Sequence, residues 1–434
     1  MTTGNRIKIK YLRVLTVFIL IITVFSGTVT GIAFAEEDYG YEADVISAIV
    51  VNETRDMVLY EKEADKRIYP ASTTKVMMAL VVASSIEDGA YSLDDTFAAY
   101  EDLYFDIPWD GSTANIQSGE IMTVRDFLYC ALMVSANEAC NALAVNDSGS
   151  VEAFVDKMNE KAAELGCEDT HFSDTHGIYH DDHYTTARDM YRIFSAVIAD
   201  HILSEIITTP EYVVPKNNKS EERELYNTNM LIDPEGPLYY EYALGGKTGY
   251  TEEAGCCLVS AAEKDEERLI CIVMGADFAE LDDGRVVPGS FVEAKELYEW
   301  CYSEYGDQPL IDPTQPVASL PVKYGKDVHS VDVVPKDGTY VYMRRSEAEK
   351  WVTYEVKFKK DTLRAPVRAG QKVGTIEAVY NGELIGSSKL VAAEDVGFSL
   401  KQMFIENTVL KVVVFFLAVF ALTFIISKIL FRKR

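Results

Sequence analysis

Apolar residues recur at helical spacing in the centre of this chain and at strand spacing on either side. The segment 47–59 carries two short β-rich runs around the polar residues 52–55, which predicts an opening hairpin. Apolar periodicity predicts helices over 72–83, 124–134, 151–165, 187–199 and 291–302. β-rich segments predict strands over 244–250, 255–262 and 268–274. Because strands stand on both sides of the helices, the pattern predicts an α+β domain rather than alternating βαβ units.

A second domain is predicted after a proline-spaced segment. Closely spaced prolines mark a shift in composition, and we place a linker over 306–316 between a first domain, 36–305, and a second, 317–395. The second domain is strand-rich, and Asn381-Gly382 between two β-rich runs predicts a two-residue hairpin. It contains no group of residues typical of a nucleophilic site, so we interpret it as a small all-β domain.

The N-terminal segment is basic and then apolar. Residues 1–35 contain no acidic residue. Their basic residues come first, and an apolar run over 14–25 and an Ala-Phe-Ala tripeptide at 33–35 follow. This is the pattern of a secretory signal peptide, 1–35, with an A-x-A cleavage site. An uncleaved anchor is the alternative, although the apolar run is short for a span of about 20 residues.

A second apolar run, 409–430, predicts a transmembrane anchor. Its charges, Lys411 and Lys428, stand near its ends, where long side chains reach the membrane surface. A helix lying on the bilayer would need a polar face, but Thr423 is the one polar residue between 412 and 426, which favours spanning over surface binding. The basic C-terminus favours a cytoplasmic end. The exported body of a single-pass protein would then lie outside the cell membrane.

Composition narrows the class of protein. The 434 residues are 48% hydrophobic and 25% charged, which is ordinary for globular proteins and excludes wholesale disorder. The formal net charge of -28 repels phosphate backbones, so a nucleic acid is a poor partner. The seven cysteines are odd in number, lie mostly in apolar segments and form no C-x-x-C motif, which favours buried thiols over a disulfide framework.

Three short motifs follow one another in the first domain. They are Ser72-Thr73-Thr74-Lys75, Ser135-Ala136-Asn137 and Lys247-Thr248-Gly249. Each motif alone is weak, because a chain of this size contains such matches by chance. Read singly, they are a helix start, a turn between helices and an exposed strand. Their order, spacing and surroundings together favour a catalytic site.

Ser72 and Lys75 pair a hydroxyl with an amine. At a helix N-terminus, oriented N–H groups can stabilise a developing oxyanion, and Lys75 projects from the same face one turn later. The apolar residues that follow predict a partly desolvated ammonium, with Lys247 as a candidate neighbouring cation. Action as a base near neutral pH needs the lysine pKa to fall by about 3 units. The alternative is a surface lysine whose ammonium lies in water.

The other two motifs offer polar groups to the same site. Ser135 and Asn137 lie at a turn between the helix ending at 134 and another predicted over 138–144. There, a hydroxyl can relay protons and an amide can hold a peptide carbonyl. Lys247 and Thr248 lie on a glycine-rich predicted strand, beside which a ligand strand can pair while the two side chains bind a terminal carboxylate.

The three motifs resemble the signature of penicillin-binding proteins and serine β-lactamases. The chain looks like a low-molecular-weight penicillin-binding protein, a serine-type D-alanyl-D-alanine carboxypeptidase. Flanking segments strengthen the resemblance: Tyr69-Pro70-Ala71, Gly111-Ser112, Gly119-Glu120, Thr175-His176-Gly177 and His183-Tyr184-Thr185-Thr186-Ala187. It covers most of 36–305, and 317–395 is similar to the family's C-terminal β domain. The all-apolar terminal segment departs from the amphipathic anchor of better-known members.

The resemblance implies a fold and a reaction. The fold is a β-lactamase/transpeptidase-like domain, in which helices flank an antiparallel sheet, followed by an all-β domain. Ser72 would be the acyl-ester nucleophile, Lys75 its proton acceptor and Ser135 a proton relay. The enzyme would remove the terminal D-alanine from peptidoglycan pentapeptide stems, in cell wall biogenesis, through an acyl-enzyme and without a cofactor. β-Lactam antibiotics would trap the same serine.

The resemblance also implies the substrate-binding residues. Asn137 would hold the stem peptide, and Lys247 with Thr248 would bind the carboxylate of the terminal D-alanine. The backbone N–H groups of Ser72 and Tyr250 would form the oxyanion hole. The substrate-binding set is therefore Asn137, Lys247, Thr248, Gly249 and Tyr250.

Two alternative functions, one enzymatic and one not, and a metal site are also compatible with parts of the sequence. A serine β-lactamase shares the nucleophile and the fold, but we find no E-x-E-L-N-like loop for deacylation. A catalytically idle peptidoglycan-binding scaffold need not retain the three motifs. Four histidines stand with aspartates in one loop, which raises zinc binding, but the resemblance implies packing and hydrogen bonding there and a serine mechanism needs no metal. These histidines are His171, His176, His180 and His183.

Overall fold

The computed structural model describes residues 40–101 and 103–431. The expected signal peptide, 1–35, and the three terminal basic residues lie outside the described residues. The chain divides into an N-terminal unit, 1–42, and a compact unit from Ala43 onward.

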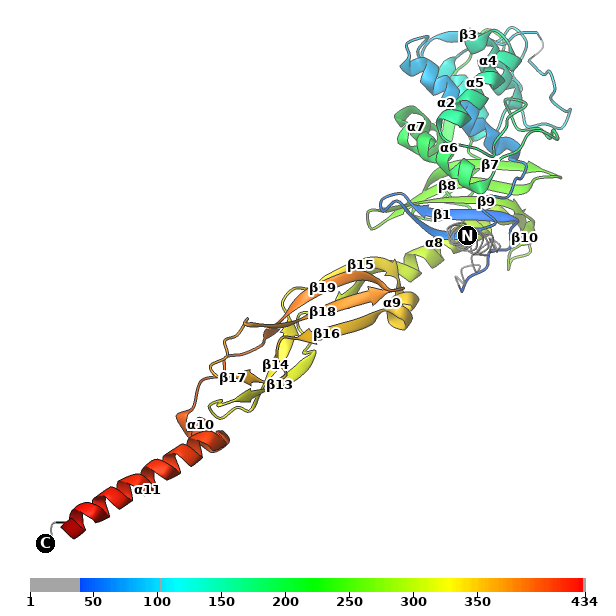
Figure 1. Ribbon diagram of the computed structural model, residues 1–434. Coiled ribbons are helices and arrows are strands. Elements are labelled where there is room, and N and C mark those ends of the chain that lie inside the picture. Colours follow the sequence, from blue (N-terminus) through cyan, green and yellow to red (C-terminus); the bar gives the residue numbers. More distant parts are fainter. Residues whose placement is uncertain (1–39, 102, 432–434) are drawn as a thin grey trace, which may run out of the picture. The chain divides into compact units, whose positions relative to one another are not determined.

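A five-stranded antiparallel sheet forms the centre of the first domain, in the order β2-β1-β9-β8-β7 (Figure 1). The strands are β1 (Ser47–Asn52), β2 (Met57–Lys62), β7 (Ala243–Thr251), β8 (Gly255–Lys264) and β9 (Glu267–Ala276). The N-terminal hairpin thus pairs, through β1, with β9 from the far end of the domain. Seven of the ten residues in each of β8 and β9 are buried, because helices cover both faces of the sheet. β7 is an edge strand, so one side of it remains available to other groups.

Helices lie on both sides of this sheet (Figure 1). A group of helices covers one face, and α8 (Gly289–Glu304) covers the other. The group comprises the short 3-10 turn η1 (Ala71–Thr74) and the helices α2 (Lys75–Glu87), α3 (Val124–Met133), α4 (Asn137–Ser148), α5 (Val151–Glu164), α6 (Ala187–Ala199) and α7 (His201–Thr208). The predicted α+β class is confirmed. The helix expected over 72–83 is divided, since Ser72 lies in η1 and the α-helix begins at Lys75.

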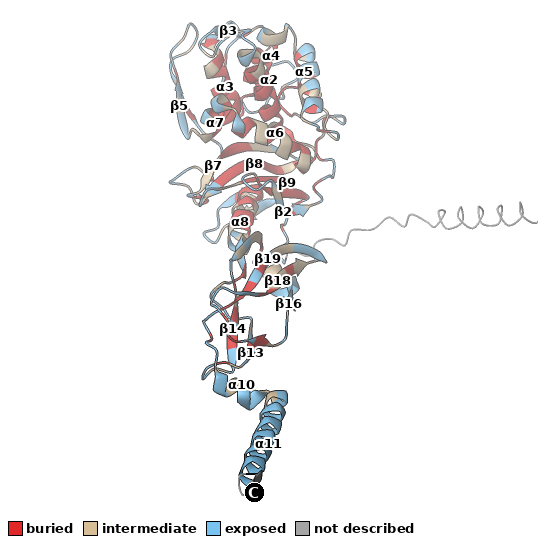
Figure 2. Cartoon of the chain, turned by 60° about the vertical axis from the view of Figure 1, so that its left-hand side comes forward, coloured by how far each residue is buried: buried red, intermediate tan, exposed pale blue. Residues whose placement is uncertain are grey.

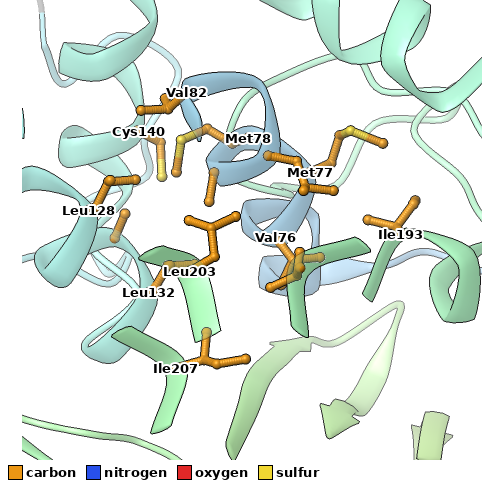
Figure 3. Close-up of a cluster of buried hydrophobic side chains, with 14 of the residues drawn as sticks. Val76, Met77, Met78, Val82, Leu128, Leu132, Cys140, Ile193, Leu203 and Ile207 are labelled. Atoms are coloured by element: carbon orange, nitrogen blue, oxygen red, sulfur yellow. The ribbon is translucent and has the colours of Figure 1, made fainter. Parts of the chain in front are cut away.

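Helix α2 runs through the middle of the helical group. Every residue from Lys75 to Ala83 is buried, because a helix that is apolar on all sides must be surrounded. In Figure 3, Val76 and Met78 of α2 lie among side chains of the neighbouring helices. Lys75 therefore starts its helix in dry surroundings.

Three small two-stranded antiparallel sheets complete the described part of the first domain and were not predicted, because strands of three or four residues carry little periodicity. They are β3 (Thr96–Ala98) with β4 (Ile121–Thr123), β5 (Glu211–Val214) with β6 (Arg223–Tyr226), and β10 (Phe278–Glu280) with β11 (Val286–Pro288).

The second domain is built from strands, as expected. A six-stranded sheet has the order β16-β18-β19-β14-β13-β17, and β12 pairs with β15 in a separate ladder. The elements are β12 (Tyr305–Ile311), β13 (Ala318–Lys323), β14 (Ser330–Pro335), β15 (Thr339–Arg344), α9 (Arg345–Trp351), β16 (Thr353–Phe358), β17 (Leu363–Arg364), β18 (Lys372–Tyr380) and β19 (Glu383–Ala392). Asn381 and Gly382 both have positive φ, 49° and 82°, and close the predicted two-residue turn between β18 and β19.

The linker expected over 306–316 needs correction. Its first half belongs to β12, which pairs in antiparallel fashion with β15. Pro309 is tolerated because β12 has a partner on one side only and the register shifts beside it. Proline spacing was therefore a poor guide to where the second domain begins.

Two helices end the described chain, α10 (Leu400–Glu406) and α11 (Thr408–Phe431). Thr408–Ile429 of α11 is a 22-residue span that contains an 18-residue window with a mean hydropathy of 2.9, and none of that window is buried. Figure 2 shows this contrast between the buried helices of the first domain and the exposed α11. By length and composition, α11 is compatible with a membrane anchor.

Candidate active site

The Ser72 hydroxyl and the Lys75 ammonium are in direct contact. Lys75 Nζ lies 2.8 Å from Ser72 Oγ across the junction between η1 and α2. Lys75 is fully buried, whereas Ser72 is partly exposed and lines a cleft. The pair thus presents an oxygen to the cleft and keeps the amine beneath it.

Two further acceptors converge on Lys75. Its Nζ lies 2.7 Å from Asn137 Oδ1, at the start of α4, and 2.7 Å from the His176 carbonyl oxygen. Burial lowers the pKa of Lys75, and the charges of Asp174 and Glu138 oppose this shift. The Lys75 Nζ is therefore held by three oxygen atoms in a site whose burial lowers the pKa of the amine.

Ser135 occupies a strained turn between α3 and α4. Its φ is 62°, in the left-handed region that non-glycine residues rarely adopt. The Oγ of Ser135 lies 3.1 Å from Lys247 Nζ. Burial, and then the positive charge of Lys75, hold the pKa of Lys247 well below its ordinary value. Lys247 was expected to lower the pKa of Lys75, but burial alone has that effect, and it is Lys75 that lowers the pKa of Lys247. Each lysine also binds a different serine.

Strand β7 passes very close to the turn that carries Ser72. A Cβ on Gly249 would lie 3.0 Å from the backbone nitrogens of Ser72 and Thr73, so a glycine is needed for this approach. Thr248 Oγ1 lies 2.9 Å from Thr228 Oγ1, and Tyr250 is exposed beside Phe278 with its ring centroid 5.2 Å away. The edge of β7 and η1 thus form two walls of one cleft.

This cleft has a volume of about 690 Å³. It is lined by six of the eight residues that the sequence singled out: Ser72, Ser135, Asn137, Thr248, Gly249 and Tyr250. Lys75 and Lys247 are buried beneath it and contact lining residues. With an oxygen nucleophile beside a desolvated amine, the site can form an acyl-enzyme at the serine. The second desolvated amine and the open strand edge can bind an anionic peptide terminus.

Sequence reasoning missed several groups at the site. The His176 carbonyl binds Lys75, but a backbone oxygen leaves no signal in sequence. Thr228 lines the cleft from a loop without any motif. The histidine loop is organised around Asp174, whose carboxylate lies 3.2 Å from His176 Nδ1 and 3.5 Å from His183 Nδ1. All seven cysteines are buried and free, as their pattern predicted.

Comparison with known proteins identifies the family. Residues 33–278 match the peptidase S11 family, D-alanyl-D-alanine carboxypeptidase, and residues 305–397 match the C-terminal domain of penicillin-binding protein 5. The chain is 30% identical over 380 residues to D-alanyl-D-alanine carboxypeptidase DacF of Bacillus subtilis, covering 87% of this chain and 93% of that one. It is 29% identical over 361 residues to DacA of Escherichia coli K12, covering 82% and 84%.

A solved structure agrees with this result. The crystal structure of penicillin-binding protein 5 from Haemophilus influenzae matches with a TM-score of 0.56 at 26% identity, over 82% of this chain and 98% of that one. The family match spans more than half of the chain, which confirms the resemblance drawn from the three motifs. The chain therefore belongs to the peptidase S11 family and is a D-alanyl-D-alanine carboxypeptidase, a hydrolase of peptidoglycan metabolism.

Proposed function

We propose that Ser72 is the nucleophile of this carboxypeptidase and that Lys75 is its base. The observation that carries the assignment is the 2.8 Å contact between Ser72 Oγ and the buried Lys75 Nζ. Neutral Lys75 takes the hydroxyl proton while Oγ attacks the carbonyl between the two D-alanines of a stem peptide. The proton then passes to the leaving amine, D-alanine departs, and water hydrolyses the acyl-enzyme.

Ser135 is the proton relay in this scheme. Its hydroxyl contacts Lys247 and lines the cleft, so it can pass a proton between an amine and the departing nitrogen. The backbone N–H groups of Ser72 and Tyr250 form the oxyanion hole, which typically contributes about 3 to 4 kcal/mol to such a reaction. The close approach of Gly249 to the Ser72 nitrogen supports this pairing.

Lys247 and Thr248 bind the terminal carboxylate. An incoming anion favours the charged form of a desolvated lysine, so substrate binding and protonation of Lys247 reinforce one another. Asn137 accepts from Lys75 through Oδ1, which leaves its amide nitrogen to hold a substrate carbonyl. Gly249 and Tyr250 continue the strand edge along which the peptide pairs.

The assignment of Ser72 is tested with the purified enzyme. D-Alanine release from diacetyl-lysyl-D-alanyl-D-alanine and labelling by a fluorescent penicillin are both expected to disappear in Ser72→Ala. The matched control is Ser303→Ala, an exposed serine on α8, which should behave as the wild type. Persistent labelling of Ser72→Ala would remove the nucleophile assignment. Nitrocefin turnover without D-alanine release would indicate a β-lactamase instead.

We also propose how the protein is organised in the cell. The signal peptide, 1–35, directs export, and the catalytic domain and the β-rich domain, whose first strand is β12, lie outside the membrane. The segment 409–430 spans the membrane as a single-pass anchor, supported by its apolar, exposed helix. A chain ending at residue 399 should leave the membrane fraction on cell lysis while the full chain stays. Retention of the shortened chain would contradict the anchor.

A further inference from the structure

Asp174 forms a short turn beside the catalytic lysine. The residue is 3% exposed. Its Oδ1 accepts hydrogen bonds from the backbone nitrogens of His176, at 2.8 Å, and Gly177, at 2.6 Å. Gly177 has a φ of 87°, which a glycine adopts without strain. One carboxylate oxygen thus fixes two consecutive peptide groups.

This turn is packed against both halves of the Ser72–Lys75 pair. The His176 carbonyl oxygen lies 2.7 Å from Lys75 Nζ. A Cβ on Gly177 would lie 1.8 Å from the Ala71 carbonyl oxygen, so the turn also abuts η1, where Ser72 is found. Any rotation of the turn would move the oxygen that holds Lys75.

The second carboxylate oxygen of Asp174 faces histidine rings that are too far away for a hydrogen bond. Oδ2 of Asp174 is buried and accepts no hydrogen bond among the described residues, and it lies 3.5 Å from His183 Nδ1 and 3.6 Å from His180 Nε2. Burial by itself raises the pKa of Asp174, but the adjacent His176 and His183 rings hold this pKa well below its usual range. The carboxylate is therefore ionised at neutral pH.

We propose that Asp174 is a positioning residue for Lys75: its carboxylate holds the His176–Gly177 turn against the lysine and supplies a buried negative charge behind it. The inference rests on the proposed role of Lys75 as the base. It assigns two separable effects to one side chain. The hydrogen bonds of Asp174 fix the position of the Lys75 amine. The negative charge of Asp174 limits how far burial lowers the pKa of that amine.

Other ionisable groups surround the pair and are unchanged by a substitution at Asp174. Those that face Lys75 are Lys247, Cys140 and Glu138. Those that face Asp174 are His176, His180 and His183, with Asp106 paired to His180. Because the two lysines interact, the acid limb of the pH profile belongs to the pair.

Asp174→Asn separates charge from geometry, since the amide oxygen can still accept both backbone hydrogen bonds. Removal of the negative charge favours neutral Lys75, so the acid limb of kcat/KM should move by about 0.5 to 1 pH unit toward lower pH. Asp174→Glu keeps the charge but displaces the carboxylate. Its limb should stay at the wild-type position while the plateau of kcat/KM falls by about tenfold, as misplaced catalytic groups typically cost.

Asp182→Asn is the matched control. Asp182 belongs to the same loop, is exposed and binds Ser173 Oγ at 2.8 Å, away from Lys75. Its pH profile should match the wild type. The profiles are measured for D-alanine release and, independently of deacylation, for acylation by fluorescent penicillin, with thermal melting as the check of folding.

An unshifted acid limb in folded Asp174→Asn would overturn the charge effect, and an undiminished plateau in Asp174→Glu would overturn the positioning effect. If Asp174→Asn does not fold, a shifted limb in Asp174→Glu overturns the inference and an unshifted one supports it. Failure of the proposed function looks different, because Lys75→Ala would then keep wild-type acylation whatever happens at Asp174.

Discussion

Gly249 of β7 passes so close to Ser72 that a Cβ at position 249 would lie 3.0 Å from the Ser72 backbone nitrogen. The nitrogen is one of the two proposed oxyanion donors, so this contact couples the edge of the sheet to the chemistry. The glycine is needed for space, because its backbone is not in the left-handed region.

Gly249→Ala should therefore displace η1 from β7. We expect a loss of about 1 to 3 kcal/mol in the free energy of unfolding from overpacking, and a fall in penicillin acylation of about tenfold to a hundredfold as the oxyanion donors separate. Chemical denaturation and labelling kinetics measure the two effects. Gly306→Ala on β12, where the nearest atom is the flexible Gln308 amide at 3.8 Å, is the control. If Gly249→Ala were acylated at the wild-type rate, the proposed coupling between the sheet edge and the chemistry would be wrong.

Ser135 combines an unfavourable backbone with a functional hydroxyl. Ser135→Ala should reduce D-alanine release by about a hundredfold while leaving thermal stability nearly unchanged, because the φ of 62° remains strained. Ser135→Gly should be equally inactive but more stable, by about 0.5 to 1 kcal/mol, since glycine accepts this φ. If Ser135→Gly regained activity, the hydroxyl would have no part in proton relay.

Lys247 can be tested with the substrate's own carboxylate. Lys247→Ala should lower kcat/KM for a D-alanyl-D-alanine peptide by about tenfold to a hundredfold, the size of a lost charge-assisted hydrogen bond of roughly 1.5 to 3 kcal/mol. A peptide with an amidated C-terminus should be a poor substrate for both enzymes and show little difference between them. An equal loss on both peptides would point to a general structural role for the lysine.

The buried Glu120 and the partly exposed Arg223 form an ion pair that ties the loop before β4 to strand β6. Arg223 Nη2 lies 2.6 Å from Glu120 Oε1, and the carboxylate is fully buried. Arg223→Met should cost about 3 to 5 kcal/mol in the free energy of unfolding, because it leaves the buried Glu120 carboxylate without its cation. The double variant with Glu120→Gln should recover much of that loss. Urea denaturation measures the free energy of unfolding of the two single variants and the double variant. If the losses of the single variants simply add in the double variant, the two side chains do not stabilise the fold as a pair.

The same carboxyl predicts a pH dependence of stability. Burial raises the pKa of Glu120, but hydrogen bonds from Gln117, Asn217 and Arg223 lower it below its ordinary value of 4.5. A carboxyl with a lowered pKa in the folded state stabilises the protein above its unfolded pKa and loses that contribution as the pH falls through the folded one. Melting temperatures between pH 7 and pH 3 should fall less in Glu120→Gln than in the wild type. If the melting temperatures of both proteins fall equally with pH, the lowered pKa of Glu120 is not a source of the pH dependence.

The sequence by itself determined the elements and the chemical groups. Helical periodicity over 187–199 matches α6 residue for residue, and Asn381-Gly382 marked its hairpin, because such patterns express contacts between near neighbours. The Ser72–Lys75 contact is likewise local, being one helical turn long. Three motifs in order were sufficient to indicate the family, since each reflects a chemical requirement of the reaction.

Only the tertiary structure decided which distant groups meet. Lys247 reaches Ser135, 112 residues away in sequence, because β7 lies at the sheet edge beside the turn between α3 and α4. The His176 carbonyl reaches Lys75 because Asp174 turns the loop, and neither a backbone oxygen nor a buried aspartate has a periodic signature. The strand β12 was hidden by Pro309, which a strand paired on one side only tolerates. Long-range packing selects these contacts, and local patterns contain no information about it.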